Sequence, residues 1–103
     1  MTKVTATYMP DTKICELYVY GHATGSEKVC AAVSGLVYSL AGFLINDNGT
    51  RMLHQWLEPG DAKLQFICGE RGMAAFQMAC VGFLQFEKSE PDYIQTNISE
   101  NIF

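Results

Sequence analysis

The chain has 103 residues, of which 49% are hydrophobic and 17% are charged, and its formal net charge is −4 at pH 7. We expect one domain over residues 1–103, because ordinary domains contain about 100–150 residues and so large an apolar fraction excludes disorder. The seven basic residues are scattered. They form no stripe that suits a phosphate backbone, so nucleic acid binding is not expected.

The four cysteines are Cys15, Cys30, Cys68 and Cys80, and no two of them form a Cys-x-x-Cys pair. The beginning of the chain is polar and strand-like, unlike a signal peptide. Free thiols in a reducing cytoplasm are therefore expected. With only two histidines and no paired ligand spacing, neither a metal site nor a cofactor is expected.

The first twenty residues predict a β-hairpin. Residues 2–9 alternate and are rich in β-branched side chains, and residues 13–20 alternate again with Cys15, Leu17 and Val19 on one face. Alternation with period two is typical of half-buried strands, and the short connection makes the pair a hairpin.

A helix capped by Ser26 or Gly25 is predicted to run to about Ile45, where the Asn-Asp-Asn-Gly run at 46–49 ends it. The segment 29–46 carries no formal charge and approaches the length of a membrane span. Its many small residues and amphipathic neighbouring strands favour a buried helix instead, so no membrane partner is expected.

Small residues mark one face of this helix, at Ala31, Gly35 and Gly42. Such a face allows another helix to approach closely. The partner is predicted to be either residues 70–87 of the same chain or the same helix of a second subunit. The mean hydropathy of +0.05 is high for a free monomer of this size and favours the homodimer.

The second half predicts a further hairpin, a helix and a last strand. Residues 51–57 and 62–68 read as strands around a Pro-Gly turn, residues 70–87 as a helix, and residues 93–99 as a strand. His54 alternates with its neighbours on the first of these strands and is predicted to be a packing histidine. The order ββαββαβ indicates an α+β fold, with one mainly antiparallel sheet and two helices.

The candidate chemistry lies where the first hairpin leads into the first helix. Cys30 lies in the first helical turn or just beyond it, where the helix dipole favours a thiolate by about 0.3–1 kcal/mol. That is too little to ionise a thiol at neutral pH, so a protonated imidazole is needed, and His22 lies eight positions upstream. Cysteines at this position are more often plain buried residues, and strand-end histidines are more often surface groups.

If the pair is functional, Cys30 attacks a carbonyl and His22 delivers the proton to the leaving amine. The N–H groups of the first helical turn are candidate oxyanion donors. Ser34, one turn later on the same face, is a candidate to orient the site, and Glu27 to compensate the dipole or orient His22. The other three cysteines are predicted to belong to the core.

The same residues resemble a known family. Gly-His-Ala at 21–23, the acidic Glu27 and Cys-Ala-Ala-Val-Ser at 30–34 are similar to the signature of the ribosomal-processing cysteine proteases, Prp. The resemblance extends over nearly the whole chain, from the leading hairpin at 2–20 to the tail Glu-Pro-Asp-Tyr-Ile at 90–94.

The resemblance implies a small α+β homodimer with a Cys/His dyad, here His22 and Cys30. In Firmicutes and their relatives, family members remove an N-terminal extension from a large-subunit ribosomal protein, the twenty-seventh in the conventional list. Related phages use such proteases to trim capsid or scaffold proteins. This chain has a shorter His–Cys loop and Glu27 where Asp is typical. The shorter loop retains the dyad, and a divergent paralogue or a phage-borne member with another substrate fits these departures equally well.

The sequence therefore predicts a cytoplasmic, cofactor-free cysteine endopeptidase that acts on a flexible N-terminal segment of a ribosomal or phage capsid or scaffold protein. The alternative is a non-catalytic homodimeric binding or assembly module on the same scaffold. The reactivity of Cys30 distinguishes the two predictions, because only the protease needs an activated thiolate.

Overall fold

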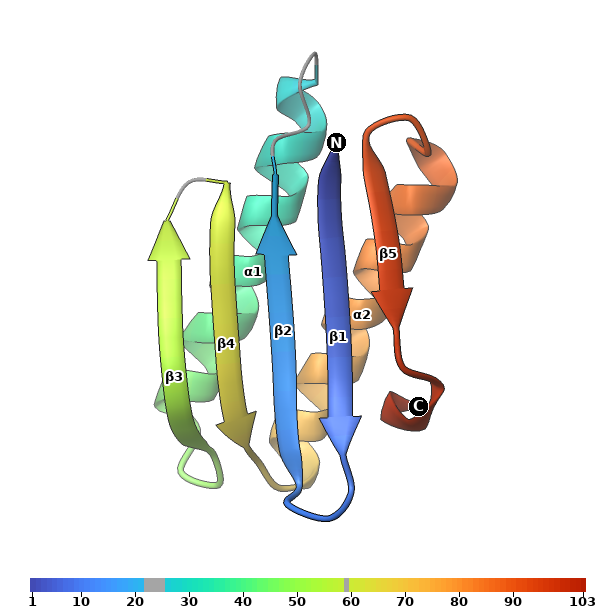
Figure 1. Ribbon diagram of the computed structural model, residues 1–103. Helices are drawn as coiled ribbons and strands as arrows, with labels where there is room; N and C mark the ends of the chain where they lie inside the picture. The colour runs from blue at the N-terminus through green and yellow to red at the C-terminus, as the bar shows by residue number, and fades with distance from the viewer. Residues whose placement is uncertain (22–25, 59) are drawn as a thin grey trace.

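The computed structural model describes residues 1–21, 26–58 and 60–103. Its elements follow the predicted order and end with a short 3₁₀ helix that the sequence patterns did not indicate (Figure 1). They are β1 (Thr2–Met9), β2 (Ile14–Tyr20), α1 (Glu27–Asn46), β3 (Arg51–Glu58), β4 (Asp61–Ile67), α2 (Glu70–Ser89), β5 (Ile94–Ile98) and η1 (Glu100–Ile102). The predicted bounds are thus correct to within two residues at each end.

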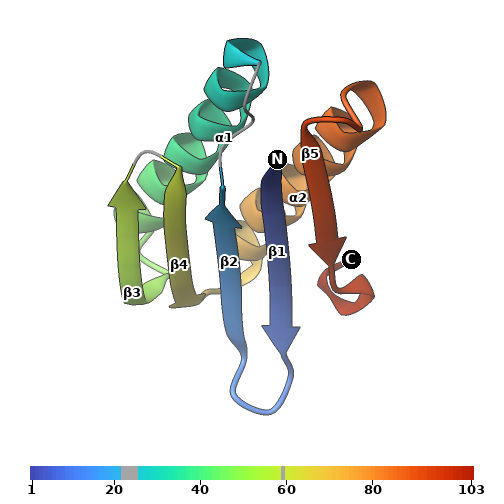
Figure 2. The same cartoon turned by 45° about the horizontal axis from the view of Figure 1, so that its top comes forward.

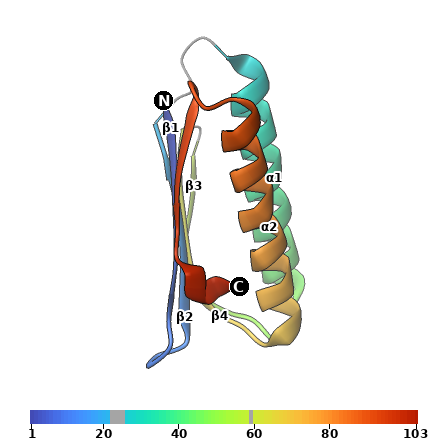
Figure 3. The same ribbon diagram turned by 90° about the vertical axis from the view of Figure 1, so that its right-hand side faces the viewer.

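The five strands form one sheet in the order β3-β4-β2-β1-β5. The pairs β1–β2, β2–β4 and β3–β4 are antiparallel, whereas β1 and β5 are parallel. Both helices cover the same face of the sheet, so the molecule has two layers (Figure 3). The predicted α+β class and the mainly antiparallel sheet are confirmed, with the sheet mixed because of its last strand.

The core lies between the sheet and the two helices. Alternate strand residues face the helices, so Cys15, Leu17 and Val19 are buried together as their period predicts. On the helix side, Phe76 and Phe83 of α2 are fully buried. Of the predicted core cysteines, Cys15 and Cys80 are buried and Cys68 is half-buried.

The helix α1 is covered on one side only. Among all the residues that the structure describes, α1 is the one helix long and apolar enough to cross a membrane by length and composition. Here it packs on the sheet beside α2 (Figure 2). The contact with α2 places Leu36 against Gly82, where a Cβ would lie 2.6 Å from Leu36 Cδ2. By contrast, a Cβ on Gly35 or Gly42 would have no neighbour within 4 Å in the described part of the chain. The α2 of the same chain is therefore not the partner of the small-residue face.

The prediction for His54 was wrong. This side chain is exposed, because β3 is an edge strand and has little of the protein around it. A register shift between Met52 and His54 also interrupts the alternation on which the prediction rested.

Candidate active site

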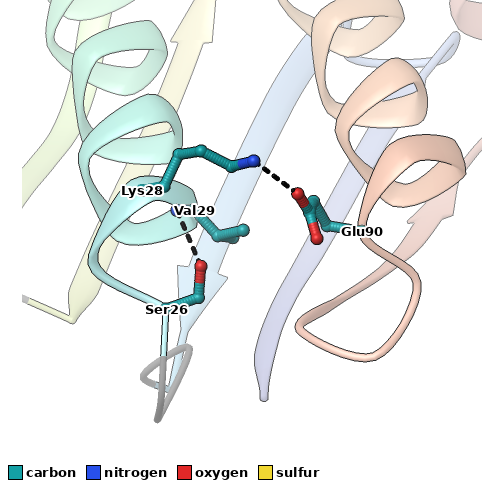
Figure 4. A network of polar contacts seen from close by, with 4 residues as sticks. All are labelled: Ser26, Lys28, Val29 and Glu90. Atoms are coloured by element: carbon teal, nitrogen blue, oxygen red, sulfur yellow. Dashed lines mark hydrogen bonds and ion pairs between the residues drawn. The ribbon is translucent and has the colours of Figure 1, made fainter.

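Ser26 determines where α1 begins. Its side-chain Oγ accepts a hydrogen bond from the Val29 N–H at 3.3 Å (Figure 4), and its carbonyl oxygen accepts one from the Cys30 N–H at 3.3 Å. Of the two N-caps that the sequence predicts, the structure has Ser26, which satisfies donors that a helix start otherwise leaves without partners. Cys30 consequently lies at the end of the first helical turn, and Glu27 is exposed at its beginning.

A cavity of about 160 Å³ lies between the N-terminal half of α1 and the neighbouring ends of the strands. A volume of this size holds a single ring or side chain rather than a folded segment. Cys30 and Ser34 both line it, so the structure places these two predicted residues in one cavity. The remaining lining residues come from α1, from the four strands β1 to β4 and from two glycines between elements: Thr2, Val19, Gly21, Val33, Val37, Tyr38, Leu57, Glu58, Gly60, Asp61 and Ala62.

Gly21, the residue directly after β2, also lines this cavity. Its φ of +82° is in the left-handed region, and a Cβ there would lie 2.6 Å from the backbone oxygen of Met1. Only glycine fits both conditions. His22, the next residue, and the alternative cap Gly25 lie outside the described residues. The pairing of His22 with Cys30 therefore remains a prediction.

Two carboxylates on the cavity wall were not foreseen. Glu58 and Asp61 flank the turn between β3 and β4, whose Pro59 lies outside the described residues. Among the residues that the structure describes, Asp61 Oδ1 is the buried side-chain oxygen without a hydrogen-bond partner. No local motif marks Asp61, because its place follows from the pairing of β4 with β2, where it faces Tyr20.

The other three thiols are held in their protonated form. Burial raises the pKa of Cys15 and that of Cys80 to about 12, and burial also raises the pKa of Cys68. Desolvation disfavours the charged thiolate, so these cysteines are poor nucleophiles at neutral pH.

An ion pair joins the beginning of α1 to the end of α2. Lys28 Nζ lies 2.8 Å from Glu90 Oε1 (Figure 4), and this hydrogen bond raises the pKa of Lys28. The ammonium group is well exposed, so solvent screens its attraction to the carboxylate. In the described ranges, no group of three or more His, Cys, Asp or Glu side chains is placed to hold a metal ion.

Known proteins match this chain in fold rather than in sequence. No family model and no curated protein matches the sequence. Solved structures do match, and they define the class of fold as a two-layer α+β fold of small single-domain proteins.

The fold is that of the ribosomal processing protease Prp. The crystal structure of an essential Prp from S. aureus in complex with a covalently linked product peptide has a TM-score of 0.81 and 18% sequence identity, covering 96% of this chain and all of that chain. The same protease in complex with a substrate peptide has a TM-score of 0.73 at 16% identity, with 96% of this chain and 100% of that chain covered. A protein from Streptococcus mutans has a TM-score of 0.72 at 21% identity over 95% of this chain and 93% of that chain. The resemblance seen in the sequence is confirmed at the level of the fold.

Proposed function

We propose that the chain is a ribosomal-processing type cysteine endopeptidase of the Prp family, with Cys30 as nucleophile and His22 as its proton carrier. The observation that carries the proposal is the position of Cys30, in the first turn of α1 and on the wall of a cavity of side-chain size. The fold around it matches, over its whole length, a protease whose structure holds a covalently linked product peptide. A covalent product is what a nucleophilic side chain leaves in such a cavity.

In the proposed reaction, the Cys30 thiolate attacks the scissile carbonyl carbon and forms a thioester as the C–N bond breaks. His22 gives its proton to the leaving amine and then takes one from the water that hydrolyses the thioester. The N–H groups of Val29 and Cys30 already donate to Ser26. We therefore narrow the predicted oxyanion donors from the whole first turn to the N–H groups of Glu27 and Lys28.

Ser34 and Glu27 receive supporting roles in the proposal. Ser34 lies one turn after Cys30 on the same cavity wall, where its hydroxyl is placed to contact a bound peptide. Glu27 is exposed in the first turn, where its negative charge compensates the dipole or orients the imidazole of His22.

The proposed substrate is a flexible N-terminal segment of a larger protein in the cytoplasm. The bound peptides of the Prp structures support a peptide substrate. The four cysteines are not joined in disulfides, which is consistent with a reducing compartment. The N-terminal extension of the twenty-seventh large-subunit ribosomal protein and the N-termini of phage capsid or scaffold proteins are the two candidates.

A homodimer through α1 is part of the proposal. Ala31 and Gly35 are exposed, and a Cβ on Gly35 would have open space around it. Such a surface admits the backbone of a second helix at short distance. The occupant we propose is the same face of α1 in a second copy, and the resemblance to the family implies the homodimer itself.

The deciding experiment is incubation of the purified protein with the two kinds of N-terminal segment, with the products read by mass spectrometry. A single cleavage is expected, abolished in Cys30→Ala and retained in Cys68→Ala, a matched loss of one half-buried thiol elsewhere. If the protein binds these peptides without cutting them, it is the non-catalytic binding module instead. Cleavage by Cys30→Ala at the full rate would contradict the proposed nucleophile.

A further inference from the structure

The two edges of the sheet differ in how they are protected. At β5, the Thr96 N–H donates to Glu87 Oε2 at 2.8 Å, and the Thr96 hydroxyl donates to Glu87 Oε1 at 2.7 Å. Beyond the end of β5, Asn101 Nδ2 donates to the Tyr8 carbonyl oxygen at 3.0 Å. With only five residues and this cover from α2 and η1, the β5 edge is closed to another strand.

The β3 edge has none of this protection. The strand is eight residues long, and six of these residues are exposed. Within the described parts of the chain, no loop or side chain outside the sheet hydrogen-bonds to the backbone of residues 51–58. Its charged residues, Arg51 and Glu58, stand at its two ends, and the six residues between them include no Lys, Asp, Glu or Pro. Exposed edge strands usually carry such residues, because a row of unpaired N–H and C=O groups accepts another strand.

The open edge leads directly to the cavity. Leu57 and Glu58, the last two residues of β3, form part of the same cavity wall as Cys30. A chain that pairs with β3 therefore reaches the candidate nucleophile at the end of its ladder. An extended peptide that pairs with β3 can continue into the cavity, whereas a second copy of β3 would make no contact there. The position of the cavity therefore favours a peptide as the occupant of this edge.

We propose that β3 is the docking strand for the substrate, which adds to the sheet as a sixth strand and enters the cavity beyond Glu58. This inference rests on the proposed function and names the mode of substrate binding. Backbone hydrogen bonds supply the affinity in such pairing, and alternate side chains supply the specificity. The register shift between Met52 and His54 limits the regular ladder to residues 54–58. Trp56, opposite Lys63 in the ladder, is half-exposed and offers an apolar contact to a peptide side chain that lies beside it on the same face of the sheet.

The chain contains a built-in reporter for this test, because Trp56 is its single tryptophan. The probe is a synthetic peptide of about ten residues, long enough to extend past an ordinary strand, taken from the ribosomal-protein N-terminal segment used above. Bound to Cys30→Ala, it is expected to shift the Trp56 fluorescence. It is also expected to slow the exchange of those alternate amides of residues 53–58 that point away from β4, at least about tenfold. Exchange in residues 94–98 of the closed edge is the internal control and is expected to stay unchanged.

Methylation of single backbone nitrogens in the peptide tests the pairing itself. Only alternate N–H groups of an added strand face its neighbour. Methylation at those positions is expected to weaken binding about tenfold, and at the intervening positions by less than about twofold. A flat or aperiodic response would overturn the docking mode, as would unchanged exchange in β3.

The result separates the docking mode from the proposed function. Cleavage without protection of β3 overturns the docking strand and leaves the protease. Protection of β3 and the alternating response, without cleavage, support the docking strand and remove the protease. If a higher protein concentration slows the amide exchange of β3 in the absence of peptide, a second copy of the chain occupies this edge and the inference fails.

Discussion

The backbone N–H of Cys30 donates a hydrogen bond to the carbonyl oxygen of Ser26 at 3.3 Å, the first bond within α1. Ser26 also caps the helix through its side chain. Ser26 therefore both begins the helix and fixes the backbone position of Cys30, the candidate nucleophile. The local geometry of the candidate site depends on this capping motif.

The first prediction concerns that cap. Ser26→Ala removes the acceptor of the Val29 N–H and is expected to lower the free energy of unfolding by about 1 kcal/mol. Urea denaturation measures the loss. Ser26→Asp, which keeps an oxygen acceptor at the helix start, is expected to retain most of the stability. Equal stability of the two variants would show that the capping bond contributes nothing.

The second prediction concerns thiol reactivity. At pH 6.5 we expect iodoacetamide to modify Cys30 at least about a hundredfold faster than Cys15 and Cys80, whose pKa of about 12 leaves almost no thiolate. His22→Ala is expected to remove most of this advantage. Mass spectrometry of tryptic peptides at successive times measures each rate. Equal, slow modification of all four cysteines would favour the binding module.

The third prediction concerns alkaline stability. Burial raises the pKa of Cys80 from the ordinary value of 9.0 to about 12, so the folded state binds more protons than the unfolded state between these values. The stability that this thiol contributes is complete below pH 9 and is lost as the pH rises toward 12, with a slope of about 1.4 kcal/mol per pH unit. In Cys80→Ala, the free energy of unfolding is expected to fall less steeply as the pH rises from 8 to 10.5, measured by urea denaturation. Val33→Ala removes buried atoms without a titrating group, and a slope as flat as that of Cys80→Ala would contradict the assignment.

The fourth prediction concerns the junction of β4 with α2. A Cβ on Gly72 would lie 2.5 Å from the Cβ of Cys68 and 3.0 Å from the Thr50 hydroxyl oxygen. Gly72→Ala is therefore expected to displace the start of α2 and to lower the free energy of unfolding by about 1–3 kcal/mol. Gly69→Ala is the matched control, because a Cβ there has no described neighbour within 4 Å, and its effect is expected to stay within about 0.5 kcal/mol. Thermal denaturation compares the two.

The fifth prediction concerns assembly. Gly35→Leu adds a bulky side chain to the small-residue face of α1, and we expect it to convert the proposed dimer to monomers or aggregates in sizing chromatography. Gln85→Leu adds a similar apolar group to an exposed position of α2 and is expected to leave the dimer intact. Elution of the wild-type protein as a monomer would contradict the proposed dimer.

Much of the fold was predictable because its signals are local. The alternation at Cys15, Leu17 and Val19 predicts which face of β2 is buried, since successive side chains on a strand point to opposite faces. Ser26 was predicted as a cap because a short polar side chain before an apolar run satisfies the first N–H groups of a helix. The placement of Cys30 at the start of α1 follows from that cap.

Tertiary structure alone decided the rest, because strand pairing joins residues that are distant in sequence. The parallel β1–β5 pair, the edge position of β3 and the exposure of His54 all follow from the sheet order. Asp61 and Leu57 reach the wall beside Cys30 only because β4 pairs with β2 on one side and with β3 on the other. Local periodicity determines which side of a strand is apolar, but it carries no information about which strand has no outer neighbour.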